Sequence, residues 1–137
     1  MKTIGVGVIG TAFMGKAHSI AYAAAGSVFG DGLRPSLEMI CDYNSERAEV
    51  MRTEMGFSRC TSDWMDVVND PKVQLISVCV PNSLHKEISV AALKLGKHVW
   101  CEKPMSTNLA DSEAMLAAAQ ASNAQTILGY NYTQNPA

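Results

Sequence analysis

The chain has 137 residues, of which 47% are apolar and 18% charged, a balance that excludes a disordered protein and is ordinary for one soluble domain. The formal net charge is −2 and like charges do not run together, which argues against a nucleic-acid or anionic-membrane partner. No segment approaches the roughly 18 consecutive apolar residues of a membrane span. We therefore expect a cytoplasmic protein with no membrane partner.

The elements expected in the first half alternate between strand and helix. They are a strand over 4–9, an alanine-rich helix over 15–25, a loop-like insertion over 30–35, a strand over 37–41, a helix capped by Asn44 or Ser45 and ended by Gly56, and a short strand near 58–60.

The second half continues the alternation. It predicts a brief helix capped by Ser62 or Asp63, a strand over 74–80, a helix capped by Asn82 or Ser83 with the apolar stripe Leu84, Ile88, Ala91, Ala92 and Leu95, a strand over 98–101, a helix over 107–122 and a strand over 126–128. Strands separated by helices form a parallel sheet covered on both faces. The fold class is therefore α/β, a doubly wound parallel sheet in a single domain.

The four cysteines recur at near-regular spacing, each in or beside an apolar run: Cys41, Cys60, Cys79 and Cys101. No Cys-x-x-Cys pair occurs, so neither a metal site nor a redox pair is expected. We interpret these residues as buried free thiols that act as small apolar side chains.

A glycine-rich turn follows the first predicted strand, with Gly10, Ala12 and Gly15 in a G-x-A-x-x-G pattern. Between a strand and a helix, such a turn lets backbone N–H groups and the helix dipole bind a dinucleotide pyrophosphate. Alanine at the middle position adds a methyl group that pushes the phosphate slightly outward. A purely structural glycine turn is the alternative. The expected phosphate-binding residues are Gly10, Thr11, Ala12, Phe13, Met14 and Gly15.

Asp42 ends the second predicted strand and gives independent support for a dinucleotide. A carboxylate at this place can accept the hydroxyls of the adenosine ribose and would repel a 2′-phosphate. A solvated aspartate that starts a turn is the alternative. Arg47 follows five residues later and keeps NADP open. The sequence thus favours NAD over NADP as the cofactor.

Two further strand ends carry polar residues, Val80-Pro81-Asn82 and Cys101-Glu102-Lys103-Pro104. Ligands of doubly wound sheets bind outside the carboxyl ends of the strands. A lysine near a nicotinamide can hydrogen-bond the reacting oxygen, and partial burial would lower its pKa toward neutrality. We therefore predict that Lys103 is catalytic and that Glu102 orients it or contacts the nicotinamide. His18 and His98 are expected to be structural.

Four motifs in order resemble the N-terminal Rossmann domain of the glucose–fructose oxidoreductase / inositol dehydrogenase / MocA family. They are Gly10-x-x-x-x-Gly15-x-x-His18, Asp42, Val80-Pro81-Asn82-x-x-His85, and Gly96-Lys97-His98-Val99-x-x-Glu102-Lys103-Pro104. The resemblance implies an NAD(P)-dependent oxidoreductase acting on CH–OH groups of a sugar, inositol or related polyol. It places His85 beside the cofactor, although a partly exposed structural histidine is the alternative. The expected cofactor set also includes Val80, Pro81, Asn82, Glu102, Lys103 and Asn131.

The resemblance also implies a second α/β domain that shapes the substrate pocket and often mediates oligomerisation. We expect the Rossmann domain over 1–130 and the start of a crossover to a missing domain over 131–137, so that the piece binds cofactor with little or no turnover and self-associates. Many members have arginine where Thr133 stands, which leaves the substrate open. The alternative function is a non-catalytic nucleotide-binding or redox-sensing module; a methyltransferase is a distant third.

Overall fold

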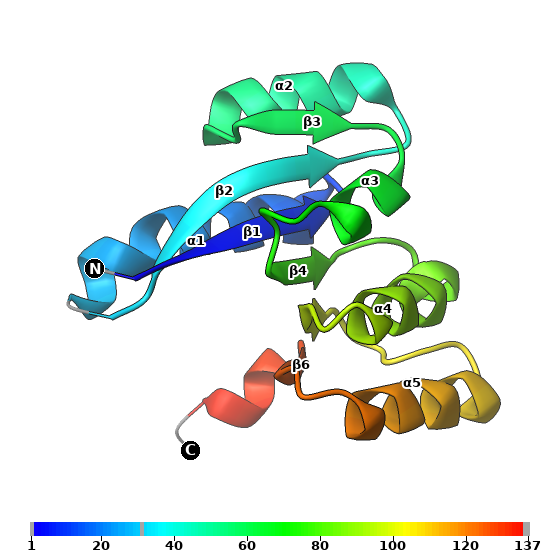
Figure 1. The fold of residues 1–137 in the computed structure, drawn as a ribbon. Helices are drawn as coiled ribbons and strands as arrows, with labels where there is room; N and C mark the ends of the chain where they lie inside the picture. Colours follow the sequence, from blue (N-terminus) through cyan, green and yellow to red (C-terminus); the bar gives the residue numbers. More distant parts are fainter. Residues whose placement is uncertain (1, 31, 136–137) are drawn as a thin grey trace.

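A computed structural model describes residues 2–30 and 32–135 (Figure 1). The strands are β1 (Thr3–Ile9), β2 (Arg34–Cys41), β3 (Arg59–Thr61), β4 (Leu75–Val78), β5 (His98–Cys101) and β6 (Thr126–Leu128). The helices are α1 (Phe13–Phe29), α2 (Ser45–Met55), α3 (Trp64–Asn69), α4 (His85–Lys94) and α5 (Leu109–Ala121). Two 3₁₀ turns are η1 (Asn82–Leu84) and η2 (Asn131–Gln134).

The strands form a parallel sheet in the order β3-β2-β1-β4-β5-β6. The order reverses between β1 and β4, since the chain first builds outward to β3 and then returns to build toward β6. Such a reversal opens a crevice at the carboxyl ends of the two central strands, where doubly wound sheets bind ligands. The predicted fold class is confirmed.

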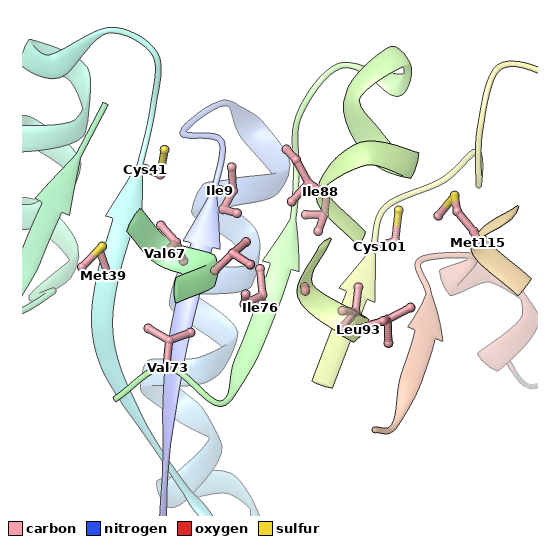
Figure 2. Packing of buried hydrophobic residues seen from close by; sticks show 14 residues of the cluster. Ile9, Met39, Cys41, Val67, Val73, Ile76, Ile88, Leu93, Cys101 and Met115 are labelled. Atoms are coloured by element: carbon pink, nitrogen blue, oxygen red, sulfur yellow. The ribbon is translucent and has the colours of Figure 1, made fainter. Parts of the chain in front are cut away.

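Helices cover the sheet on two sides (Figure 1). On one side, α3, α4 and α5 pack on β-strand residues in a large apolar cluster that includes Ile9, Ile76 and Cys101 (Figure 2). On the other side, Tyr22 of α1 and Met51 of α2 pack on a smaller cluster. Both faces of the central strands are thereby removed from water, which explains why β1 reads as a nearly continuous apolar run.

The helix caps agree with the sequence in part. Asn44 and Asp63 cap α2 and α3 through their side chains, and Gly56 ends α2 with a φ of 80°. The predicted cap of α4 by Asn82 or Ser83 is wrong, because η1 occupies those residues and α4 begins at His85 without a side-chain cap.

Three other predictions also need correction. α1 runs to Phe29, four residues beyond the expected end, and β2 begins at Arg34, whose N–H donates to the Lys2 carbonyl. The expected loop over 30–35 is therefore shorter. Its Asp31, like residues 136–137 of the predicted crossover, lies outside the described residues.

The apolar stripe predicted for α4 is displaced, because Leu84 and Leu95 are exposed. Its buried residues are His85, Ile88, Ser89, Ala92 and Leu93.

All four cysteines are free. Cys41 and Cys101 are buried as expected, whereas Cys60 and Cys79 are half-buried. Burial raises the pKa of the Cys41 thiol to about 12 and that of Cys101 to about 11, so both stay protonated at neutral pH. Across the described ranges, no helix is long and apolar enough to cross a membrane, and no three metal-ligating side chains gather to hold an ion.

Candidate functional site

The polar strand ends predicted from the sequence lie at one edge of the sheet. Gly10 follows β1, Asp42 follows β2, and Glu102 follows β5. Their backbones are tied together there: the Gly10 N–H donates to the Cys41 carbonyl (2.8 Å), and the Glu102 N–H donates to the Val78 carbonyl (3.0 Å). The carboxyl ends of β2, β1, β4 and β5 thus form one continuous rim.

α1 begins without the side-chain cap that α2, α3 and α5 have. Asn44, Asp63 and Asn108 bond the first N–H groups of α2, α3 and α5, whereas Ala12 offers no side-chain cap to α1. The first turn of α1 also holds no acidic residue. The start of this 17-residue helix thus has neither a side-chain cap nor an acidic first turn, and helix N-termini of this kind favour anions.

Gly10 and Gly15 allow this helix end to sit close to the sheet. Gly10 has a φ of 105°, and a Cβ on it would lie 2.2 Å from the Cys79 carbonyl oxygen. A Cβ on Gly15 would lie 1.9 Å from the Gly10 carbonyl oxygen. Since backbone atoms cannot yield as a flexible side chain does, both positions require glycine.

Asp42 is buried, and both of its carboxylate oxygens have partners. Oδ1 accepts from the Asn44 N–H (2.9 Å) and from Arg47 Nη2 (3.2 Å), and Oδ2 accepts from the Thr11 hydroxyl. Burial on its own would raise the pKa of this carboxyl, but the bonds from Thr11 and Asn44 and the charge of Arg47 outweigh burial and hold the pKa below its usual range. Asp42 is therefore ionised at neutral pH.

A pocket of about 380 Å³ lies between the ends of β1, β2 and β4, and its volume is within the usual range of small-ligand sites. Seven of the predicted cofactor residues line it: Gly10, Thr11, Ala12, Asp42, Arg47, Val80 and Pro81. Tyr43 and Trp64 add aromatic surface, and the Arg47 guanidinium stacks 4.9 Å from the centre of the Tyr43 ring. The other predicted cofactor residues lie outside this lining: Phe13, Met14, Gly15, Asn82, His85, Glu102, Lys103 and Asn131.

Lys103 lies one residue beyond Glu102 at the end of β5, so it shares the rim with the pocket but lies on the side away from Asp42. Its side chain is exposed, which corrects the expectation of partial burial. Glu102 is buried, and its Oε2 accepts from the Lys103 backbone N–H (3.3 Å). This bond ties the Glu102 carboxylate to the backbone at Lys103.

His85 is buried completely, contrary to the interpretation as a partly exposed residue. Its Nδ1 lies 2.8 Å from the Pro104 carbonyl oxygen and its Nε2 lies 2.9 Å from that of Val80. The ring thus links the loops after β4 and β5. Any influence on a cofactor passes through these loops, because the side chain is not open to the pocket.

Sequence reasoning missed one buried polar cluster. His18 contacts both Ser77 and Glu102, and Tyr22 contacts Ser77. The signal that could have found it is the place of His18, three residues after Gly15 on the helix face that meets the sheet. The alanines around His18 instead favoured a packing role.

Comparison with known proteins agrees with this geometry. Residues 4–130 match the GFO/IDH/MocA model, described as an oxidoreductase family with an NAD-binding Rossmann fold. The chain belongs to this family. The match covers the sheet from the second residue of β1 onward and the helices α1 to α5, as the sequence motifs implied.

Two curated relatives of this oxidoreductase domain act on sugars or polyols, according to their names. Levoglucosan dehydrogenase of Pseudarthrobacter phenanthrenivorans is 39% identical over 138 residues, covering 100% of this chain and 35% of the relative. Myo-inositol 2-dehydrogenase of Thermotoga maritima is 31% identical, covering 92% of this chain and 36% of the relative. The chain therefore spans about a third of the length of these relatives.

Solved structures give the same assignment. A levoglucosan dehydrogenase in complex with NADH superposes with a TM-score of 0.94 at 38% identity, over 97% of this chain and 36% of the other. Another complex, with NADH and levoglucosan, also has a TM-score of 0.94. The Rossmann fold of this oxidoreductase domain is thus shared in detail with a dehydrogenase that holds NADH.

We expect the acid stability of this domain to depend on Asp42. The pKa of Asp42 is lower in the folded chain than the value near 3.9 of an unfolded aspartate, so its stabilisation is complete above that value and is lost as the pH falls through the folded pKa. Asp42→Asn should lower the free energy of unfolding at pH 7 and make its decline toward about pH 2 shallower. Denaturant melts over this pH range measure both effects.

Glu113→Gln is the matched control, because Glu113 is an exposed carboxylate on α5, far along the sheet from Asp42. It should leave the free energy of unfolding at pH 7 nearly unchanged, as is usual for an exposed residue. Equal acid profiles for the wild-type and Asp42→Asn proteins would contradict the stabilising role of the Asp42 bonds.

Proposed function

We propose that this domain binds NAD(H) along its rim and presents Lys103 to a sugar or polyol substrate of a longer oxidoreductase. The observation that carries the proposal is the uncapped start of α1, which opens beside Gly10 into the pocket that also holds the Asp42 carboxylate. An anion-binding helix end and a ribose-binding carboxylate in one pocket fit the pyrophosphate and adenosine of a dinucleotide.

The order of the strands sets the direction in which the cofactor would lie. Asp42, after β2, would take the adenosine ribose, and Thr11 and Arg47 would share or yield their bonds to that carboxylate. The pyrophosphate would lie at the N-terminus of α1 after β1. The nicotinamide half would then extend past Val80 and Pro81 toward Glu102 and Lys103, because β4 and β5 are the next strands of the sheet.

Lys103 has the chemistry that dehydrogenation of an alcohol requires. In oxidation the bound nicotinamide would accept a hydride from the substrate carbon, while the Lys103 amine would hydrogen-bond the hydroxyl oxygen and take up the hydroxyl proton. In reduction both transfers would run in reverse. The sugar and polyol substrate class rests on the relatives, since levoglucosan dehydrogenase and myo-inositol 2-dehydrogenase share this part of the chain.

Calorimetric titration of the folded chain with NAD⁺ and NADH tests the binding half of this proposal. A single site with saturating heat is expected. A folded sample that binds neither form would overturn the proposal. A domain that binds NADH but supports no turnover once joined to a substrate domain would instead be a non-catalytic nucleotide-binding module.

We expect NAD to bind more tightly than NADP, and Asp42 to be the main cause. The buried, ionised carboxylate repels a 2′-phosphate, although a relative 30% identical over 87% of this chain is an NADP⁺-dependent scyllo-inositol 2-dehydrogenase. Asp42→Ala should weaken NAD by about tenfold, the scale of a lost charged hydrogen bond, while leaving NADP unchanged or stronger because Arg47 is freed. Titrations with both cofactors measure this ratio.

Glu46→Ala is the control for this experiment, since Glu46 is an exposed carboxylate in the first turn of α2. It removes one negative charge near the pocket without touching the Asp42 partners. If Asp42→Ala weakened NADP more than NAD, the carboxylate would not read the ribose.

We also expect the chain to self-associate. Tyr130 and Tyr132 are 47% and 83% exposed, and Ile127 of the edge strand β6 is 54% exposed. Exposed apolar groups on neighbouring residues at a sheet edge favour association. Sedimentation velocity at increasing concentration should show a species heavier than the monomer, and a strictly monomeric protein at high concentration would count against this expectation.

A further inference from the structure

Four buried polar side chains form a continuous line beneath the carboxyl end of β5. The Tyr22 hydroxyl lies 2.7 Å from Ser77 Oγ, Ser77 Oγ lies 2.9 Å from His18 Nδ1, and His18 Nε2 lies 2.8 Å from Glu102 Oε1. Their exposed fractions are 8%, 0%, 5% and 7% in the order Tyr22, Ser77, His18 and Glu102. The line joins α1 to β4 and to the residue that precedes Lys103.

The chemistry of the four groups gives the line a direction. Burial raises the pKa of Tyr22 to about 12, so its hydroxyl keeps its proton and can donate to Ser77. Ser77 can then donate to His18 Nδ1, and His18 donates from Nε2 to the Glu102 carboxylate. In this direction each donor meets one acceptor, and the line requires the His18 tautomer that carries its proton on Nε2.

The neighbours of Glu102 leave its carboxylate little freedom to move. Oε2 accepts from the Lys103 N–H, and a Cβ on Gly129 would lie 2.6 Å from Oε1. The His18 ring also packs 4.5 Å from the centre of the Trp100 ring. A buried carboxylate without its donor is costly, so loss of His18 would make Glu102 turn toward solvent and release Lys103.

We propose that His18 is a positioning residue that, with Ser77 and Tyr22 behind it, holds Glu102 and thereby sets the rim that receives the nicotinamide half of the cofactor. This inference rests on the proposed NAD(H) binding. The rim then has two parts. Asp42 and the start of α1 hold the ADP half of the cofactor, and the line from Tyr22 to Glu102 affects only the nicotinamide half, which lies toward Lys103.

The test compares NADH with ADP-ribose, which keeps the ADP half but has no nicotinamide. Titrations would use the 137-residue chain and the variants His18→Leu, His18→Gln, Ser77→Ala and Ser89→Ala. Glutamine can place an amide donor near the position of Nε2, whereas leucine cannot. Ser89→Ala is the matched control, because Ser89 is as buried as Ser77 but lies on α4, outside the line.

The affinity ratio of NADH to ADP-ribose should fall by about tenfold in His18→Leu and Ser77→Ala, the scale of one hydrogen bond to a charged group. It should fall less in His18→Gln and stay constant in Ser89→Ala. The same ratio in all five proteins would overturn the inference, as would equal losses for both ligands. A wild-type chain that binds neither ligand would instead overturn the proposed function.

Nitrogen NMR of the His18 ring reports which ring nitrogen carries a proton, and this measurement is separate from whether the variant folds. A wild-type ring with a protonated Nε2 and an unprotonated Nδ1 agrees with the donor line, and Ser77→Ala should change the Nδ1 signal. The opposite tautomer in the wild-type protein would contradict the line. If His18→Leu does not fold, Ser77→Ala still decides the matter, since it keeps the histidine.

Discussion

Replacing Lys103 with alanine is expected to lower kcat by roughly 10²–10⁴-fold, the usual scale of a lost acid–base or electrostatic group. Lys103 is exposed and lies beyond the end of β5, so the fold and NAD affinity should be nearly unchanged. The assay needs a substrate domain. A chimera in which this chain replaces the matching third of levoglucosan dehydrogenase would provide one, with levoglucosan as substrate.

Two further variants make the Lys103 experiment specific. Lys103→Arg should not restore turnover, because a guanidinium is larger and stays protonated. Lys94→Ala removes another exposed lysine, in the last turn of α4, and should leave kcat unchanged. Turnover near the unmodified level in Lys103→Ala would make Lys103 a structural residue and move the proton chemistry to the rest of the enzyme.

Replacing Gly10 with alanine is expected to cost about 2–5 kcal/mol in the free energy of unfolding, from strain at positive φ and from overpacking. The new Cβ would lie 2.2 Å from the Cys79 carbonyl oxygen, so the ends of β1 and β4 must separate. Because the same movement displaces the start of α1, NADH affinity should fall by about a hundredfold or more, beyond the loss expected for a single bond.

Gly32→Ala is the matched control for Gly10. A Cβ at Gly32 meets nothing within 4 Å, so both stability and NADH affinity should stay close to the wild-type values. Thermal melts and titrations on the two variants decide the matter. A Gly10→Ala protein that is as stable as Gly32→Ala and binds NADH equally well would show that the tight turn is not required.

The parallel sheet could be predicted because apolar runs mark its strands and side-chain caps mark the starts of α2, α3 and α5. β5 and β6 are found at the expected residues, and Asn44 and Gly56 bound α2 as their chemistry requires. Errors arose where tertiary packing overrides local pattern. Ile88 and Ala92 of the expected stripe on α4 are buried. His85 and Ser89 are polar yet buried on the same face, so the apolar spacing marked only part of it.

The candidate site was predictable at the level of strand ends rather than of contacts. Sequence position places Asp42 and Lys103 on the same rim, since parallel strands end at a common edge. It does not show that Thr11 and Arg47 occupy the Asp42 carboxylate, nor that His18 reaches Glu102 across 84 positions of sequence. Such contacts depend on how α1 packs on the sheet, which no local spacing encodes.

An NMR titration of the isotope-labelled chain shows directly whether NADH lies along the rim from Asp42 to Lys103. We expect NADH to shift the amide signals of Thr11, Asp42, Val80 and Lys103. ADP-ribose should shift Thr11 and Asp42 but leave Lys103 nearly unmoved. Shifts centred instead on the apolar pocket between α4, α5 and β6, or none at saturating NADH, would show that NADH does not bind along this rim.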